Sequence, residues 1–195
     1  MGSRGLVVAV ICGALVLGGL ALPIADAERL RRATDGGLVA VANAVDRNPT
    51  ASGWRRLAER YQDHATGASP AGLRLYEREA ARAYREAARV APAHARTWLH
   101  LADLALRRGD DAREAAALLA QSSRTAPRRP AYVRWRAHRA IEVWASAADP
   151  DRRVLARQIA RAWRTDRDAL RTHAETDDLV DALRDAVVLA GTGGR

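Results

Sequence analysis

The feature that most constrains the fold is a pattern of large, small and helix-ending residues that occurs twice along the chain. Each copy begins with a tryptophan, continues with small residues at positions where two helix backbones could approach closely, and ends at a proline. The residues of the first copy are Trp54, Leu57, Ala58, Tyr61, Ala80, Tyr84 and Pro92. Those of the second are Trp98, Leu101, Ala102, Ala105, Ala115, Leu119 and Pro127. Repetition of this kind predicts helix pairs that bury their apolar faces against one another.

The first copy resembles the consensus of the tetratricopeptide repeat (TPR), in which W-x2-L-[GA]-x2-Y is followed by A-x3-[FY] and a later proline. The second copy has alanine in place of the tyrosine. A composition rich in alanine and arginine and without phenylalanine also favours helix over strand. We therefore expect an all-α fold. The resemblance implies a TPR-like α-solenoid of antiparallel helix pairs, preceded by an N-terminal transmembrane or signal helix.

Weaker helical signals flank the two copies. The predicted helices are residues 27–34 and 38–49 before the first copy, and 131–147, 149–163, 168–174 and 177–190 after the second. The last two would cap the exposed end of the stack. Between Tyr61 and Ala80 the chain has about ten residues more than a repeat needs. Because Ser69 and Pro70 form a good helix start, the following helix is expected to begin early.

An uncharged apolar segment occupies residues 6–22 and is preceded by Arg4. About 20 such residues are needed to span a bilayer, and Ala25-Asp26-Ala27 has the A-x-A form that signal peptidase recognises. The sequence therefore leaves two alternatives: a single-pass anchor in the cytoplasmic membrane, or a signal peptide cleaved after Ala27. Both place a TPR-like domain of residues 28–190 in the periplasm or another extracytoplasmic space. Residues 1–27 are the anchor or signal, and residues 191–195 are expected to be a flexible tail.

The formal charge of +9 leaves two interpretations open. Arginine in place of every lysine, together with abundant alanine, is typical of codon bias in a GC-rich genome, whereas a basic surface could also bind an acidic polymer or anionic lipid. Nucleic acid is disfavoured because no basic run is longer than two residues. Cys12 is the only cysteine, so an intrachain disulfide is excluded.

Catalytic and metal-binding motifs are not evident in the sequence. The five histidines include no pair at i, i+4 and have no cysteine near them, whereas zinc motifs place such ligands close together. The acidic pairs Asp110-Asp111 and Asp177-Asp178 are interpreted as a turn and a helix N-terminus, where carboxylates favourably meet the helix dipole. We expect neither a metal nor a cofactor, and we do not expect an enzyme.

In TPR proteins the first helix of each pair lines a concave groove, and the resemblance implies the same here. The groove residues expected on this basis are Arg55, Glu59, Gln62, Arg96, Leu99, Asp103, Leu106, Arg134 and His138. The alternative for each of them is an ordinary solvated helix face. The carboxylate clamp of chaperone-binding TPR domains is disfavoured, because the only asparagines are Asn43 and Asn48.

The expected function is that of a membrane-associated scaffold that binds a partner protein in a bacterial envelope assembly. The C-terminal third also resembles TPR-like accessory proteins of bacterial exopolysaccharide and O-antigen systems, on the residues Trp144, Arg157, Ala162, Trp163 and Asp166. That resemblance implies an integral-membrane or other envelope protein as partner, or the anionic glycan itself. The alternative function is direct binding of an acidic polymer or anionic lipid through arginines. The oligomeric state is not indicated.

Overall fold

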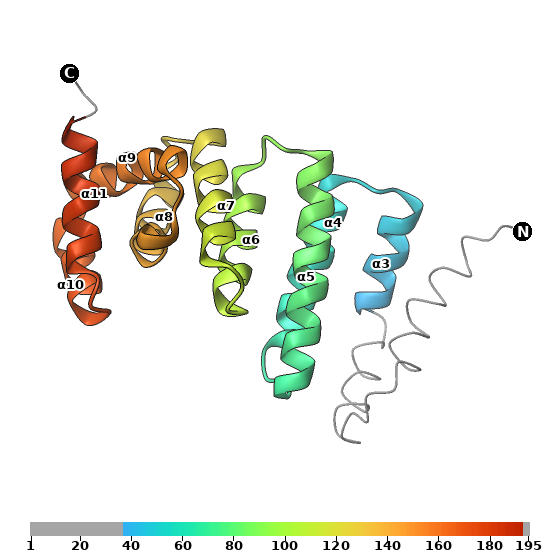
Figure 1. Ribbon diagram of the computed structural model, residues 1–195. Helices are drawn as coiled ribbons and strands as arrows, with labels where there is room; N and C mark the ends of the chain where they lie inside the picture. Colours follow the sequence, from blue (N-terminus) through green and yellow to red (C-terminus); the bar gives the residue numbers. More distant parts are fainter. Residues whose placement is uncertain (1–36, 193–195) are drawn as a thin grey trace, which may run out of the picture. The chain divides into compact units, whose positions relative to one another are not determined.

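The computed structural model describes residues 37–192, and all regular structure among them is helical (Figure 1). The prediction of an all-α fold is thus confirmed for this part of the chain. The α-helices are α3 (Gly37–Arg47), α4 (Ala51–Ala65), α5 (Pro70–Val90), α6 (Ala95–Arg107), α7 (Ala112–Thr125), α8 (Pro130–Glu142), α9 (Asp149–Thr165), α10 (Arg167–Thr176) and α11 (Val180–Thr192). A 3₁₀ turn, η1 (Trp144–Ser146), follows α8.

The predicted apolar segment, the predicted helix at residues 27–34 and the last three residues lie outside the described part of the chain. Within residues 37–192, no helix is both long enough and apolar enough to cross a membrane.

Two compact units divide the chain, and the boundary falls inside α5, between Ala80 and Ala81. In the first unit, α3 packs against α4, and Val45 and Leu57 are buried. Polar side chains fix where its helices begin. The Thr50 Oγ1 atom accepts a hydrogen bond from the Gly53 amide at 3.0 Å, as an N-cap residue does.

The early start predicted for the helix after the long connection is confirmed, because α5 begins at Pro70. The Ser69 hydroxyl accepts a hydrogen bond from the Gly72 amide at 3.2 Å, and Pro70 occupies the first helical position, where its missing N–H is not needed. The helix is therefore 21 residues long.

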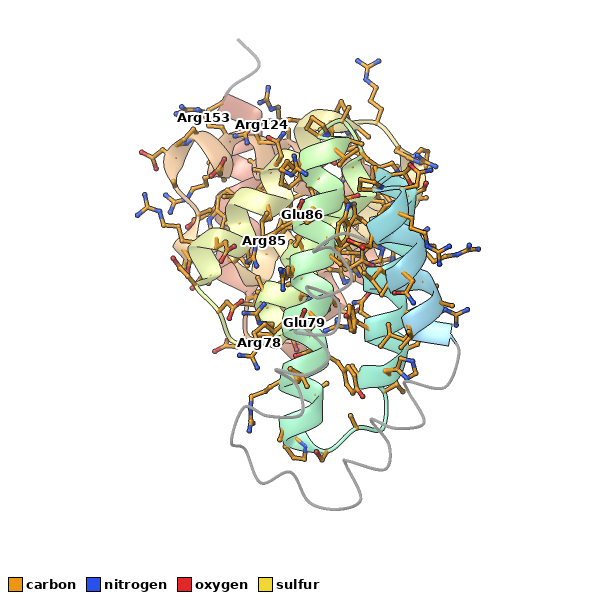
Figure 2. All side chains as sticks on the ribbon, turned by 90° about the vertical axis from the view of Figure 1, so that its right-hand side faces the viewer. Arg78, Glu79, Arg85, Glu86, Arg124 and Arg153 are labelled. Atoms are coloured by element: carbon orange, nitrogen blue, oxygen red, sulfur yellow. The ribbon has the colours of Figure 1, made fainter. Side chains whose placement is uncertain are left out.

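In the second unit, α6 and α7 lie side by side and run in opposite directions (Figure 1). Their tight turn depends on Gly109, whose φ of +67° is the left-handed conformation that glycine adopts without a Cβ clash. The Asp111 carboxylate then accepts a hydrogen bond from the Arg113 amide at 2.8 Å and caps α7. At the surface, Arg85 of α5 pairs with Glu114 of α7 at 3.2 Å, and Arg124 of α7 pairs with Asp151 of α9 at 2.6 Å. Figure 2 labels Arg85 and Arg124.

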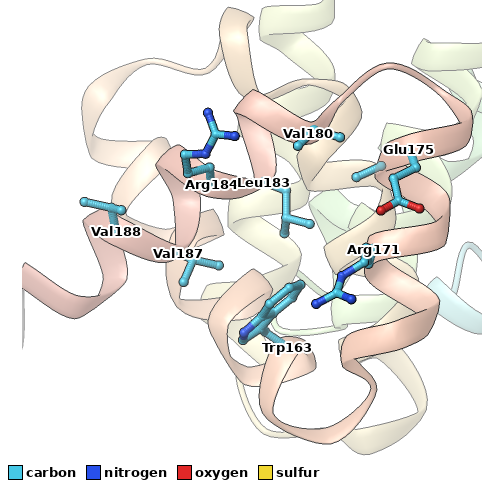
Figure 3. Close-up of a pocket in the computed structure, with 9 residues that line it drawn as sticks. Trp163, Arg171, Glu175, Val180, Leu183, Arg184, Val187 and Val188 are labelled. Carbon is cyan, nitrogen blue, oxygen red and sulfur yellow. The ribbon is translucent and has the colours of Figure 1, made fainter.

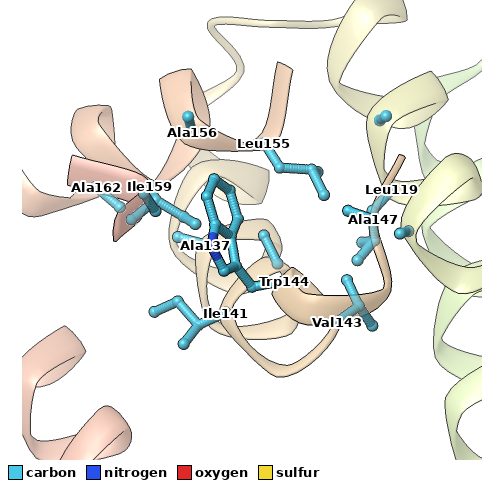
Figure 4. Packing of buried hydrophobic residues seen from close by; sticks show 14 of the residues in the cluster. Leu119, Ala137, Ile141, Val143, Trp144, Ala147, Leu155, Ala156, Ile159 and Ala162 are labelled. Atoms are coloured by element: carbon cyan, nitrogen blue, oxygen red, sulfur yellow. The ribbon is translucent and has the colours of Figure 1, made fainter. Parts of the chain in front are cut away.

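One continuous apolar cluster joins α6 to α11 within the second unit. Alanine is its most frequent member, as expected where helix backbones approach closely, and leucine, isoleucine and tryptophan fill the remaining volume. Figure 4 shows Trp144 near its centre, surrounded by Ala137, Leu155 and Ile159. The core therefore holds α8, η1 and α9 together.

Two predicted helix ends are wrong, and both have a local cause. The helix predicted to end near Ala147 stops at Glu142, because the chain tightens into η1 and buries Trp144. The last helix begins at Val180 and not at 177, because Asp178 has a positive φ of 56° and breaks the helical path. Asp177 is therefore at the C-terminal end of α10 and not at a helix N-terminus.

Candidate functional site

A connected group of charged and imidazole side chains lies on one side of the second unit, on the helices α6, α8 and α10. We call it the polar face. Its members are Asp103, Arg107, Arg134, His138, Arg139, Glu142, His173 and Asp177. Helices α6 and α8, which the TPR resemblance expects to line a groove, carry part of the polar face, and α10 with its C-cap carries the rest.

Asp103 is the anchor of the polar face. Its side chain is on α6, and the residue is only 8% exposed. Two guanidinium groups compensate its charge: Nη1 of Arg107 lies 3.1 Å from Oδ2, and Nη2 of Arg139 lies 2.9 Å from Oδ1. A buried carboxylate is strongly destabilising without such partners. Asp103 is therefore held in one position by a residue of its own helix and one of α8.

Arg139 extends this network to the end of α8. Its Nη1 group donates to both carboxylate oxygens of Glu142, at 3.1 and 2.9 Å, and its guanidinium lies 5.7 Å from the centre of the Trp135 ring. Burial, the largest single influence, lowers the pKa of Arg139, but the hydrogen bonds and charges of Glu142 and Asp103 together raise it above its ordinary value. Arg139 therefore stays protonated and links two carboxylates.

Two histidines face each other between α8 and α10. The rings of His138 and His173 are stacked with centroids 4.4 Å apart and an interplanar angle of 26°. The Nδ1 atom of His173 lies 3.2 Å from Asp177 Oδ2, and its Nε2 atom lies 3.4 Å from Glu142 Oε1. Burial, followed by the influence of His173 and Arg134, lowers the pKa of His138, so this imidazole is neutral at pH 7.

Three of the residues that sequence analysis expects in a groove belong to the polar face: Asp103, Arg134 and His138. Arg134 is exposed and pairs with Asp166 at 3.2 Å. Sequence reasoning missed Arg139, Glu142 and His173, whose contacts join different helices.

The remaining predicted groove residues lie in other surroundings. Leu99 is 6% exposed and belongs to the core, and Leu106 packs against the same core. Arg96 is exposed on α6 and donates a hydrogen bond to His100. Arg55, Glu59 and Gln62 are half-buried on α4, in the first unit.

An apolar pocket of about 300 Å³ is present at the C-terminal end of the second unit (Figure 3). Trp163 of α9 forms one wall, and Leu183 and Val187 of α11 form another. The side chains of Arg171 and Glu175, on α10, border it. The pocket has the mainly apolar lining that is usual for ligand sites, but it lies at the lower limit of their size.

His100, next to the polar face on α6, should make the second unit sensitive to mild acid. Its ring stacks on Tyr84 at 5.1 Å, and its Nε2 atom accepts a hydrogen bond from Arg96 at 3.0 Å, which requires the neutral imidazole. Burial, aided by the charge of Arg96, lowers its pKa from 6.5 to about 4.

Because this folded-state pKa lies below the unfolded value, the contribution of His100 to stability is complete above pH 6.5 and is lost as the pH falls toward 4. We expect the urea midpoint to decrease between pH 7 and pH 4.5, and to decrease less in His100→Gln. Equal pH dependence of the two proteins would contradict this assignment.

Comparisons with protein-family models, with curated proteins and with solved structures gave no match. The geometry itself defines what the polar face can do. It presents carboxylates, guanidinium groups and imidazoles at fixed positions, so it can receive charged and polar groups of another molecule without first being ordered.

Proposed function

We propose that this chain is a membrane-associated TPR-like scaffold that binds a partner protein through the polar face. The partner is an integral-membrane or envelope protein of a bacterial assembly, of the kind that makes or exports polysaccharide. The proposed architecture is an α-solenoid of antiparallel helix pairs. Its supports are the repeated sequence pattern and the successive pairs α6/α7 and α8/α9.

The observation that carries this proposal is the ion-paired state of Asp103. Asp103 is 8% exposed. If it served stability alone, apolar residues in place of the ion pair would stabilise the fold about as well. Here it instead holds Arg107 and Arg139 in position on a surface. Side chains ordered in advance lose less entropy when a partner binds, so the arrangement favours recognition.

The envelope location rests on the sequence. The apolar residues 6–22 and the A-x-A site before Glu28 direct the chain to the membrane or beyond it. The resemblance to polysaccharide accessory proteins supports the choice of assembly. Trp144 and Ala162, two residues of that resemblance, are buried in the core, so they serve packing. Trp163 lines the apolar pocket.

Charge reversal on the polar face should weaken partner capture. The variant Arg96→Glu/Arg134→Glu changes Arg134 of the polar face and Arg96 beside it on α6. Both residues are exposed, so the variant should change stability by no more than about 1 kcal/mol. We expect the recovery of the partner to fall about tenfold or more in crosslinking and affinity purification from the native membrane. The two new glutamates would repel the acidic groups of the partner that the arginines attract.

The matched control is Arg153→Glu/Arg164→Glu, which makes the same charge change on exposed residues of α9. Recovery of no envelope protein by the wild type, or equal loss in both variants, would contradict the proposal. The dependence of binding on salt distinguishes the proposed function from the alternative. Binding of an acidic polymer or anionic lipid should be lost between low and physiological ionic strength, whereas a peptide bound in a groove should remain bound.

A further inference from the structure

Two neighbouring helices of the second unit carry the same short pattern. On α8, His138 is followed four residues later by Glu142. His173 of α10 is followed four residues later by Asp177, the C-cap residue of that helix. Residues at i and i+4 lie on one face of a helix. Because α8 and α10 are in contact, the two faces bring two imidazoles and two carboxylates together.

The donor atoms converge to a small volume. Glu142, His173 and Asp177 each offer one ligand atom, and these atoms lie within 4.8 Å of one another. The Nε2 atom of His173 and Oε1 of Glu142 are 3.4 Å apart, close to the separation of about 3.3 Å between two ligands of a tetrahedral zinc ion. Small side-chain rotations would therefore complete a metal-binding geometry.

The two imidazoles each have a nitrogen atom that is free to bind a metal ion. The Nε2 atoms of His138 and His173 are both buried and have no hydrogen-bond partner among residues 37–192, since the 3.4 Å contact between His173 and Glu142 lacks hydrogen-bond geometry. Buried polar atoms in proteins are nearly always paired. Two unpaired imidazole nitrogens side by side, next to a carboxylate, are thus an exceptional arrangement that a cation would satisfy.

We propose that Glu142, His173 and Asp177 form a binding site for a divalent transition-metal ion, with Zn²⁺ as the preferred ion. Imidazole nitrogen and carboxylate oxygen are common zinc ligands, and the two carboxylates offset the charge of the cation. His138 lies stacked on His173 and is the nearest further nitrogen donor.

Asp177 has an alternative role at this site, in which it supports His173 and does not itself bind the metal. Its Oδ2 atom lies 3.2 Å from Nδ1 of His173, where it can accept the Nδ1 proton and leave Nε2 as the metal-binding nitrogen. Metal-binding histidines typically have such a carboxylate partner. Arg139 does not block Glu142, because a carboxylate has about four lone-pair sites and Arg139 occupies two.

A metal at this position would join α8 to α10 and stiffen the polar face. This inference is independent of the proposed function, since it concerns an ion and requires no protein partner. Direct binding measurements on the purified protein therefore test it without any capture experiment.

The experiment uses the full chain in detergent, without a histidine tag and treated with a chelator, and titrates it with Zn²⁺ by calorimetry. We expect one ion per chain and a higher midpoint of thermal unfolding after its addition. His173→Gln and Asp177→Asn should each weaken Zn²⁺ binding by about 100-fold or more, the upper range for loss of a metal's supporting partner. Cobalt(II) should give the visible absorption bands of a tetrahedral site in the wild type and in neither of these two variants.

Two variants serve as controls. Asp178→Asn makes the same amide change one residue away, at a positive φ that asparagine tolerates, and His64→Gln removes a histidine of the first unit. Both should bind Zn²⁺ like the wild type. If His173→Gln does not fold, as judged by circular dichroism, Glu142→Gln replaces it. Failure of the wild type to bind Zn²⁺, or unchanged affinity in the folded Asp177→Asn protein, would overturn the proposal.

Discussion

Arg136→Leu is expected to lower the free energy of unfolding by about 3 kcal/mol, because it removes three hydrogen bonds from a buried charged donor. Arg136 is 0% exposed although it carries a charge. From α8 it donates three hydrogen bonds to the end of α7: Nε to Ser122 Oγ at 3.0 Å, Nη2 to the Ser122 carbonyl at 2.8 Å and Nη1 to the Ala126 carbonyl at 2.7 Å. Arg136 thus caps the C-terminus of a neighbouring helix.

Leucine fills similar space but donates nothing, so the last turn of α7 loses three hydrogen bonds and the positive charge that its C-terminus favours. Burial lowers the pKa of Arg136 only to about 10, and the side chain therefore stays protonated at neutral pH. Arg136→Lys keeps the charge but not the fork of donors, and its loss should be intermediate.

Urea denaturation followed by circular dichroism measures these differences, with Arg157→Leu on the exposed side of α9 as control. The control should change stability by no more than about 0.5 kcal/mol. Similar midpoints for Arg136→Leu and Arg157→Leu would show that the three hydrogen bonds contribute little.

Local rules account for most of the helices in the described part of the chain. The repeat pattern placed small residues such as Ala58, Ala80 and Ala102 where helices meet, and each of them is 0% exposed. The preference of serine for the N-cap and of proline for the first helical position predicted the early start of α5, which begins at Pro70. The end of α8 depended on a tertiary effect, the burial of Trp144 in the core, which no local pattern contains.

The polar face was only partly predictable for the same reason. Repeat positions on single helices pointed to Asp103, Arg134 and His138. Arg139 of α8 contacts Asp103 of α6, which is 36 positions earlier in the sequence. This contact forms only when the two helices pack together. The turn that ends α10 at Asp177 likewise decides which side chains His173 meets.

The spacing His-x3-acid on α8 and α10 was present in the sequence, but a search for paired histidines passes over it. One imidazole and one carboxylate four residues apart are common on any solvated helix. The pattern becomes informative only when a second helix brings another histidine and carboxylate close enough for the two imidazole rings to stack, as those of His138 and His173 do.

Trp144→Ala should have the largest effect on stability, a loss of about 4 kcal/mol in the free energy of unfolding, which is typical of a large-to-small change at a buried aromatic residue. Trp144 is 6% exposed and lies among Ala137, Leu155 and Ile159 in Figure 4. Its ring also faces the guanidinium of Arg152 at 5.7 Å. Alanine would leave a cavity where α8, η1 and α9 meet.

Trp144→Phe distinguishes a role in packing from a role in binding the partner. Phenylalanine retains much of the ring volume, so the free energy of unfolding should decrease by only about 1 to 2 kcal/mol. If Trp144 serves packing alone, the folded Trp144→Phe protein captures its partner as well as the wild type does, and only thermal and urea midpoints shift. If capture falls while the midpoints stay unchanged, the packing role is wrong. Trp144 would then contact the partner, as its place in the resemblance to polysaccharide accessory proteins implies.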